Sequence, residues 1–130
     1  MTVSDKREML IFAEQRRGRV HPVAFELLGK AIELSGNRDL TVSAVLLGSN
    51  VRGEAQELIY YGAKKVYLFD DPSFYNYDPF LYKANLVALA RKINPYAILF
   101  GSTHIGRSLA PRVAADLQTG LTADCTDLSI

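Results

Sequence analysis

The chain has 130 residues and a formal net charge of +1 at pH 7, with 48% hydrophobic and 22% charged residues. This length and balance predict one globular domain with a substantial core. The near-zero charge excludes an electrostatic argument for binding nucleic acid or an anionic membrane. No apolar stretch reaches the ~18 residues that a membrane span requires, so we expect no direct membrane insertion.

The cysteine and histidine residues indicate which cellular compartment and which metal sites to expect. Cys125 is the single cysteine, so no internal disulfide can form, which fits a reducing compartment. Residues Met1–Glu8 are mixed in charge and show no targeting signal, so we expect a cytoplasmic protein. His21 and His104 lie far apart with no second cysteine, and they predict no metal site.

The first strand–helix unit begins at Met9–Ala13, a short and continuous apolar run that predicts a buried strand. A polar turn follows at Arg16–Arg19, and Pro22 fits the first position of a helix. Its apolar residues at helical spacing are Val23, Leu27, Ala31 and Leu34, and Gly36-Asn37 is a stop signal. The arginines of the turn fit a solvated turn, a subunit contact or an anion site, and the sequence leaves these open.

A second unit and a third strand follow. Val42–Leu47 predicts a strand, and Asn50 is placed to cap a helix over Val51–Tyr61. Gly62 fits the left-handed position that ends such a helix. Lys65–Phe69 predicts the next strand.

The last third of the chain continues the alternation. Asp78 followed by Pro79 predicts a helix start, and Asn94-Pro95 predicts its end. The remaining predicted elements are a strand at Ala97–Phe100, a helix at Leu109–Leu117 and a strand at Cys125–Ile130.

Strands that alternate with helices predict an α/β fold: a three-layer, mostly parallel sheet with helices on both faces. Ligands of such sheets lie beyond the carboxyl ends of the strands, at a topological switch point. The candidate ligand-binding loops are therefore Glu14–Gly18, Gly48–Gly53 and Gly101–Ser108.

The third of these loops carries the candidate site. Pro111 favours a helix that begins near Arg107 or Ser108, because a proline is tolerated where its N–H would be unpaired. A helix amino end beside a guanidinium favours an anion, and hydroxyls and an imidazole lie close by. The candidate cofactor-binding residues of this loop are Ser102, Thr103, His104, Gly106 and Arg107.

A purely structural interpretation of this loop stays open, because any strand-to-helix connection needs glycines and a capping hydroxyl. The loop nearly matches the phosphate-binding pattern G-x-x-x-x-G-K-[ST], but Arg107 occupies the lysine position and no later strand offers a magnesium-binding aspartate. No nucleophile with a base and an orienting group is evident either. We therefore expect no enzyme activity from this chain alone.

The run from Gly101 also carries a family resemblance. Gly101-Ser-Thr-His-Ile-Gly-Arg-Ser-Leu-Ala-Pro-Arg112, followed by Thr119-Gly-Leu-Thr-Ala-Asp-Cys-Thr126, resembles the alpha subunit of electron transfer flavoproteins. That family carries G-[AS]-T-x-x-G-R-[DS]-L-A-P-R and then T-G-L-x-[AT]-D-[CV]-T. Ile11-Phe-Ala-Glu14 and Tyr61-Gly-Ala63 support the resemblance.

The resemblance implies a heterodimer with a beta subunit that carries FAD. Electrons would pass from dehydrogenases, typically acyl-CoA dehydrogenases, to a quinone reductase, or take part in flavin-based bifurcation with NADH. The resemblance covers only the front part of the family's length, so we expect residues 1–130 to be an incomplete amino-terminal α/β domain. The family's main FAD-binding domain would lie carboxyl-terminal to this segment, and a second flavin would lie mainly in the beta subunit. The resemblance then makes the loop from Ser102 to Arg107 the candidate for facing that partner or flavin.

An alternative is a free-standing nucleotide-binding module of the adenine nucleotide alpha hydrolase-like class, which includes universal stress proteins. That class shares the Rossmann-like alternation of strands and helices, and it binds ATP through a glycine-rich loop after the last strand. This chain has Thr103-His-Ile-Gly-Arg-Ser108 at the corresponding place. Saturable ATP binding would distinguish this module from a flavoprotein subunit.

Overall fold

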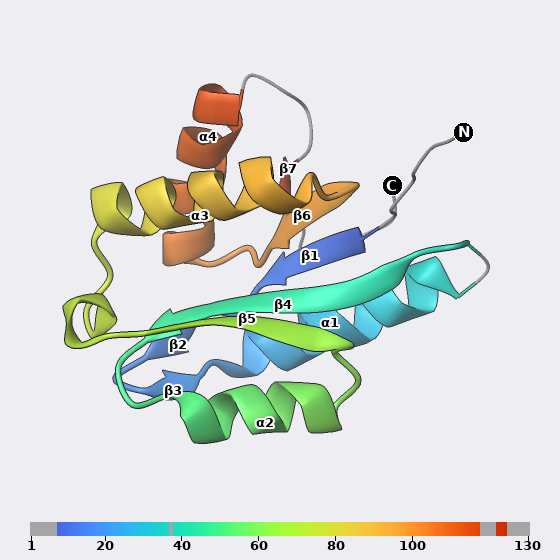
Figure 1. Ribbon diagram of the computed structural model, residues 1–130, viewed down its shortest axis with the longest axis horizontal. Coiled ribbons are helices and arrows are strands. Elements are labelled where there is room, and N and C mark those ends of the chain that lie inside the picture. The colour runs from blue at the N-terminus through green and yellow to red at the C-terminus, as the bar shows by residue number, and fades with distance from the viewer. Residues whose placement is uncertain (1–7, 37, 118–121, 125–130) are drawn as a thin grey trace.

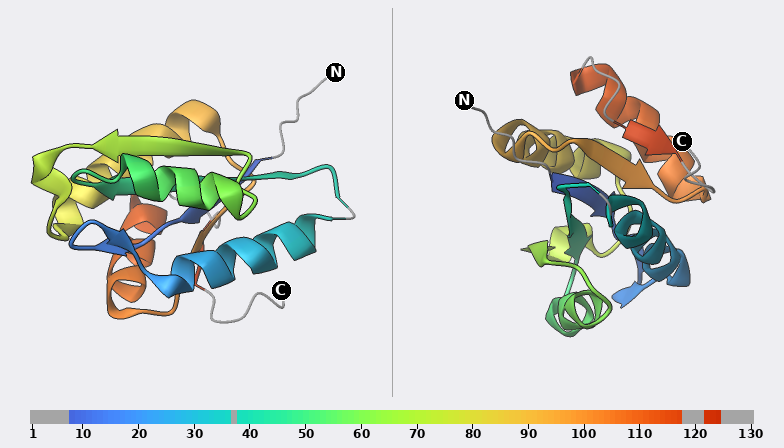
Figure 2. Two further views of the ribbon diagram at one scale, coloured as in Figure 1. Left: turned by 90° about the horizontal axis from the view of Figure 1, so that it is seen from below. Right: turned by 90° about the vertical axis from the view of Figure 1, so that its right-hand side faces the viewer.

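A computed structural model describes residues 8–36, 38–117 and 122–124, and it has three layers (Figure 1). A five-stranded parallel sheet forms the middle layer. The helices α1 (Pro22–Ser35) and α2 (Arg52–Tyr60) cover one face, and α3 (Pro79–Ile93) and α4 (His104–Leu117) cover the other, as Figure 2 also shows. The predicted α/β class with helices on both faces is therefore confirmed.

The order of the strands makes β1 the central strand. From one edge to the other, the strands are β5 (Lys65–Asp70), β4 (Thr41–Gly48), β1 (Glu8–Phe12), β6 (Ala97–Phe100) and β7 (Thr122–Asp124). The last strand lies just before the predicted one, and residues 125–130, with Cys125, lie outside the described residues, as do residues 1–7 and 37. A small antiparallel hairpin of β2 (Gln15–Arg16) and β3 (Arg19–Val20) forms in place of the predicted polar turn.

The alternation of side chains along β1 explains the two halves of the core. Met9 and Ile11 pack toward α1 and α2, whereas Leu10 and Phe12 pack toward α3 and α4. Each of these four side chains is at most 4% exposed. Burial of one large apolar side chain stabilises the fold by about 1.5–3 kcal/mol. Because both faces of β1 are buried, apolar residues are favoured at every position, and the strand sequence is a continuous apolar run.

The predicted helix starts at Pro22 and Pro79 are confirmed, and each has a capping side chain. The carboxylate of Asp78 accepts hydrogen bonds from the N–H groups of Phe80 at 2.9 Å and Leu81 at 3.1 Å. His21 caps α1 in the same way, because its Nδ1 accepts the Val23 N–H at 3.0 Å. Histidine is not among the residues that are preferred at an N-cap, so the sequence did not indicate this cap.

The predicted cap at Asn50 is wrong. Asn50 has a left-handed backbone with φ of 59°, and its N–H donates to the Asp70 carboxylate at 2.7 Å. The helix α2 begins one residue later, and its N-cap Val51 offers no side-chain hydrogen bond. A tertiary contact from the end of β5 therefore overrides the local capping preference. Gly62 does have a positive φ, of 119°, as predicted.

The predicted start of α4 is also wrong. The helix begins at His104, and Pro111 lies inside it. The Arg107 N–H already donates to the Thr103 carbonyl at 2.8 Å, so this N–H is not free to bind an anion. Pro111 lacks only the N–H that would bond four residues back, and the helix continues past that missing bond. The free N–H groups of the helix therefore belong to its true first turn, which starts at His104.

Candidate functional site

The strand order places a switch point between β1 and β6. From β1 the chain adds β4 and then β5 on one side, and it returns to add β6 on the other side of β1. The loops that leave β1 and β6 therefore run in opposite directions across the sheet. Parallel α/β sheets bind their ligands at such a place. Two of the three predicted loops, Glu14–Gly18 and Gly101–Ser108, start here.

The loop after β1 buries a carboxylate. The side chain of Glu14 lies directly beyond the strand, and the residue is 2% exposed. The hairpin turns at Arg17 and Gly18, which have φ of 55° and 85°. This turn brings Arg16 back over the carboxylate, so that its Nε and Nη2 donate to Glu14 Oε2 at 3.0 and 2.8 Å. A charge-assisted pair of this kind offsets part of the cost of burying the carboxylate.

The loop after β6 is compact because of a glycine. A Cβ atom added at Gly106 would lie 2.0 Å from the carbonyl oxygen of Gly101. This close approach places Thr103 at the N-cap of α4, where its Oγ1 accepts the Gly106 N–H at 3.0 Å. The same hydroxyl donates to Glu14 Oε1 at 2.6 Å and so joins the two loops.

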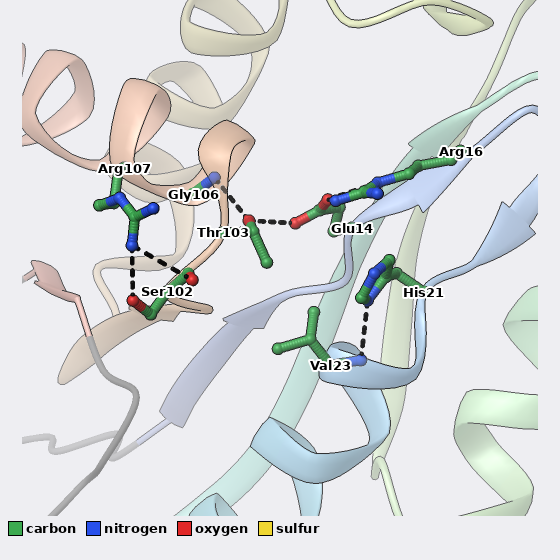
Figure 3. Close-up of polar contacts among 8 residues, drawn as sticks. All are labelled: Glu14, Arg16, His21, Val23, Ser102, Thr103, Gly106 and Arg107. Atoms are coloured by element: carbon green, nitrogen blue, oxygen red, sulfur yellow. Dashed lines mark hydrogen bonds and ion pairs between the residues drawn. The ribbon is translucent and has the colours of Figure 1, made fainter.

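These contacts form one continuous polar network across the switch point (Figure 3). The Gly106 N–H donates to Thr103, the Thr103 hydroxyl donates to Glu14, and Arg16 donates to the other carboxylate oxygen. The amino end of a helix carries a partial positive charge that favours a nearby anion. The Glu14 carboxylate therefore acts as that anion for α4, through a single intervening hydroxyl.

The predicted site residues fall into two groups in the structure. Thr103 and Gly106 belong to the network around Glu14. Arg107 and Ser102 form a separate pair, in which Arg107 Nη1 donates to Ser102 Oγ at 2.9 Å (Figure 3). Arg107 is exposed, and so is His104 at the first position of α4. The side chains of Arg107 and His104 are therefore open to solvent, whereas Thr103 and Gly106 are engaged in hydrogen bonds within the chain.

Two important residues of this site were not among the predicted ones. The sequence places Glu14 in a predicted loop and in the run Ile11-Phe-Ala-Glu14, and Arg16 in a basic cluster, but it indicates no role for either side chain in the site. A signal existed, because Glu14 is a charged residue that directly follows an apolar strand, at the end where ligands bind. Its pairing with Thr103 joins residues 89 positions apart, which no local pattern could have indicated.

The network is also fixed from the side of α3. Gln15 Nε2 donates to the hydroxyl of Tyr82 at 3.0 Å, and Gln15 Oε1 accepts the Gly18 N–H at 2.8 Å. The Tyr82 hydroxyl in turn donates to the carbonyl of Phe74. Burial raises the pKa of Tyr82, so this phenol stays protonated and can act as a donor at neutral pH. The hairpin that carries Arg16 is therefore held against the core.

Over residues 8–36, 38–117 and 122–124, no three histidine, cysteine or acidic side chains lie together in a way that could hold a metal ion. In the same part of the chain, no helix is both long and apolar enough to cross a bilayer.

Comparison with known families decides the assignment. The electron transfer flavoprotein domain matches residues 9–130. The chain belongs to the electron transfer flavoprotein family. Its relatives include the electron transfer flavoprotein subunit alpha of Thermoanaerobacterium thermosaccharolyticum, which is 46% identical over 128 residues, covering 98% of this chain and 39% of that protein.

A second relative is named as a subunit of a dehydrogenase. The lactate dehydrogenase (NAD(+),ferredoxin) subunit LctC of Acetobacterium woodii is 44% identical over 124 residues, covering 95% of this chain and 30% of that protein. The chain thus spans 39% and 30% of the length of these two relatives. The expected resemblance to the alpha subunit is confirmed along the whole chain.

Solved structures confirm the fold. A universal stress protein from Archaeoglobus fulgidus superposes with a TM-score of 0.57 at 17% sequence identity, covering 92% of this chain and 93% of that one. At this identity the likeness concerns the fold alone. It agrees with the predicted Rossmann-like fold of the adenine nucleotide alpha hydrolase-like class.

Proposed function

We propose that this chain is the amino-terminal part of an electron transfer flavoprotein alpha subunit, which pairs with a beta subunit in a heterodimer that carries FAD. One observation carries the proposal: 46% identity to an alpha subunit extends over 98% of the chain. The main FAD site lies carboxyl-terminal to this segment in the complete subunit. The segment itself serves as scaffold and subunit interface, and it has no catalytic role of its own.

The heterodimer accepts electrons from a dehydrogenase of the acyl-CoA dehydrogenase type. It passes them to a quinone reductase, or it takes part in flavin-based bifurcation with NADH. The second route gains support from the relative whose name includes both NAD(+) and ferredoxin. The compartment that fits this role is the cytoplasm.

We assign the contact with the beta subunit, or with a second flavin held mainly by that subunit, to the loop from Ser102 to Arg107. Arg107 and His104 are exposed beside the switch point, and the cationic Arg107 lies near the amino end of α4. The two exposed side chains suit a surface contact, whereas Thr103 and Gly106 hold the loop in shape. A guanidinium is also well suited to phosphate or carboxylate groups of a partner.

Co-expression of the complete alpha subunit with its beta subunit tests the proposal as a whole. We expect the two chains to co-purify and the complex to show the absorption spectrum of bound, oxidised flavin. A complex without flavin, or an alpha subunit that purifies alone, would contradict the assignment.

An arginine substitution tests the role of the loop. In the heterodimer, Arg107→Ala should weaken subunit or flavin affinity by about 10–100-fold, since a charge-assisted hydrogen bond contributes about 1.5–3 kcal/mol. Arg112→Ala is the matched control, because Arg112 is also exposed on α4, where its guanidinium lies over the ring of Phe80 at 5.5 Å from the ring centroid. Equal affinities for the two variants and the unsubstituted complex would remove the loop from the interface.

A further inference from the structure

The buried carboxylate of Glu14 lies at the place where sheets of this kind bind the anionic part of a ligand. It is 2% exposed, and it lies inside a network, between Thr103 and Arg16 (Figure 3). A carboxylate removed from water is costly unless donors satisfy it. Here three hydrogen bonds do so, two from Arg16 at 2.8 and 3.0 Å and one from Thr103 at 2.6 Å.

The donors around Glu14 are the ones that a nucleotide phosphate would use. A phosphate at a switch point is bound by a helix amino end, by hydroxyls of the preceding loop and by a cationic side chain. In this chain the helix is α4, the hydroxyl is that of Thr103 and the cation is Arg16. All three already act on one carboxylate from the same chain.

We infer that Glu14 is a built-in anion that occupies the phosphate position of the switch point, and that it makes this domain refractory to nucleotide phosphates. A ligand phosphate would meet a like charge, and it would find the Thr103 proton and the Arg16 fork already engaged. The inference concerns binding by this chain alone, so it does not rest on the proposed function.

The unsubstituted 130-residue chain provides the first test. Equilibrium dialysis with ATP and with AMP should give no saturable binding up to millimolar concentration. The unfolding midpoint should likewise stay unchanged when either nucleotide replaces sodium chloride at the same ionic strength. Saturable binding of either nucleotide with Glu14 in place would overturn the inference.

Removal of the carboxylate provides the second test. Glu14→Ala deletes the internal anion and leaves Arg16, Thr103 and the amino end of α4 without it. Inorganic phosphate should then raise the stability of this variant saturably. The half-saturating phosphate concentration should be at least about tenfold lower for the variant than for the unsubstituted chain. The matched control is Glu57→Ala, which removes an exposed carboxylate from α2 and should not respond. Equal phosphate responses of all three proteins would overturn the inference.

Glu14→Gln keeps the test decisive if the alanine variant does not fold. Glutamine preserves the shape and an acceptor for the Thr103 hydroxyl, and it removes only the charge. The same titration should show a phosphate response that the unsubstituted chain lacks. If the glutamine variant responds no more than the unsubstituted chain, the charge of Glu14 is not what excludes anions, and the inference is wrong.

Discussion

Gly106 offers the sharpest test of the geometry at the start of α4. The residue lies in the first turn of the helix, where alanine would ordinarily be the better helix former. Here an added Cβ would lie 2.0 Å from the Gly101 carbonyl oxygen, 3.1 Å from the Gly101 carbonyl carbon and 3.2 Å from Thr103 Oγ1. The two closest of these atoms belong to the backbone, so no side-chain rotation can relieve the contact.

The expected magnitude follows from two opposing effects. Alanine in place of glycine gains roughly 0.5–1 kcal/mol in a helix, because the unfolded chain loses freedom. Overpacking against rigid atoms costs about 1–3 kcal/mol and sometimes more. A displacement of the helix would also lengthen the hydrogen bond from Thr103 to Glu14. We therefore expect Gly106→Ala to lower the free energy of unfolding by about 2–3 kcal/mol in total.

The assay is urea unfolding followed by circular dichroism, with Gly29→Ala as the matched control. Gly29 is exposed in the middle of α1, and an added Cβ there would meet nothing within 4 Å. The control should raise the free energy of unfolding by about 0.5–1 kcal/mol. The same substitution should thus change the free energy of unfolding in opposite directions at the two positions. A Gly106→Ala protein as stable as the control would refute the close approach of Gly106 to Gly101.

Three further predictions concern stability away from the site. Tyr67→Phe should cost about 1–3 kcal/mol at neutral pH, since the buried Glu8 carboxylate loses the phenol that donates to it at 2.6 Å. Burial and then the hydrogen bond to Glu8 raise the pKa of Tyr67, so its contribution to stability is present below about pH 10 and is lost as the pH rises further. Between neutral and alkaline pH, the free energy of unfolding should therefore fall less for the phenylalanine variant than for the unsubstituted chain. An equal fall for both proteins would contradict this. Ser43→Ala should leave stability unchanged or raise it by about 1 kcal/mol in urea unfolding, because the buried Ser43 hydroxyl has no hydrogen-bond partner among the described residues, and a clear loss would show a hidden partner. Asp78→Ala should cost about 1 kcal/mol through loss of the α3 cap, whereas Asp78→Asn should cost much less, and equal losses would argue against capping.

Much of the fold could be predicted from the sequence because its signals are local. The apolar run at Met9–Ala13 and the Asp78-Pro79 pair depend on burial and on backbone capping within a few residues. The order of the layers then follows from the alternation of strands and helices. The errors at Asn50 and Pro111 arose where tertiary contacts override local preference. Asn50 is held by Asp70, and α4 starts early because Thr103 and Gly106 form its cap.

The site could be predicted only in part for the same reason. The loop after β6 was indicated by its glycines and by its place in the fold, and Thr103 and Gly106 do shape it. Which of its groups are engaged inside the chain depends on the loop after β1. The contact between Glu14 and Thr103 crosses 89 residues, so only the folded sheet brings the two together.

The most direct test of the subunit assignment is amide hydrogen exchange on the complete alpha subunit, measured alone and in complex with its beta subunit. The amides of His104 and Ile105 lie in the first turn of α4, where a helix offers no internal acceptor, so they report on outside contacts. We predict that exchange across Ser102–Arg107 slows when the beta subunit binds. Stable complex formation with unchanged exchange in this loop would contradict the placement of the interface, and no complex at all would contradict the assignment itself.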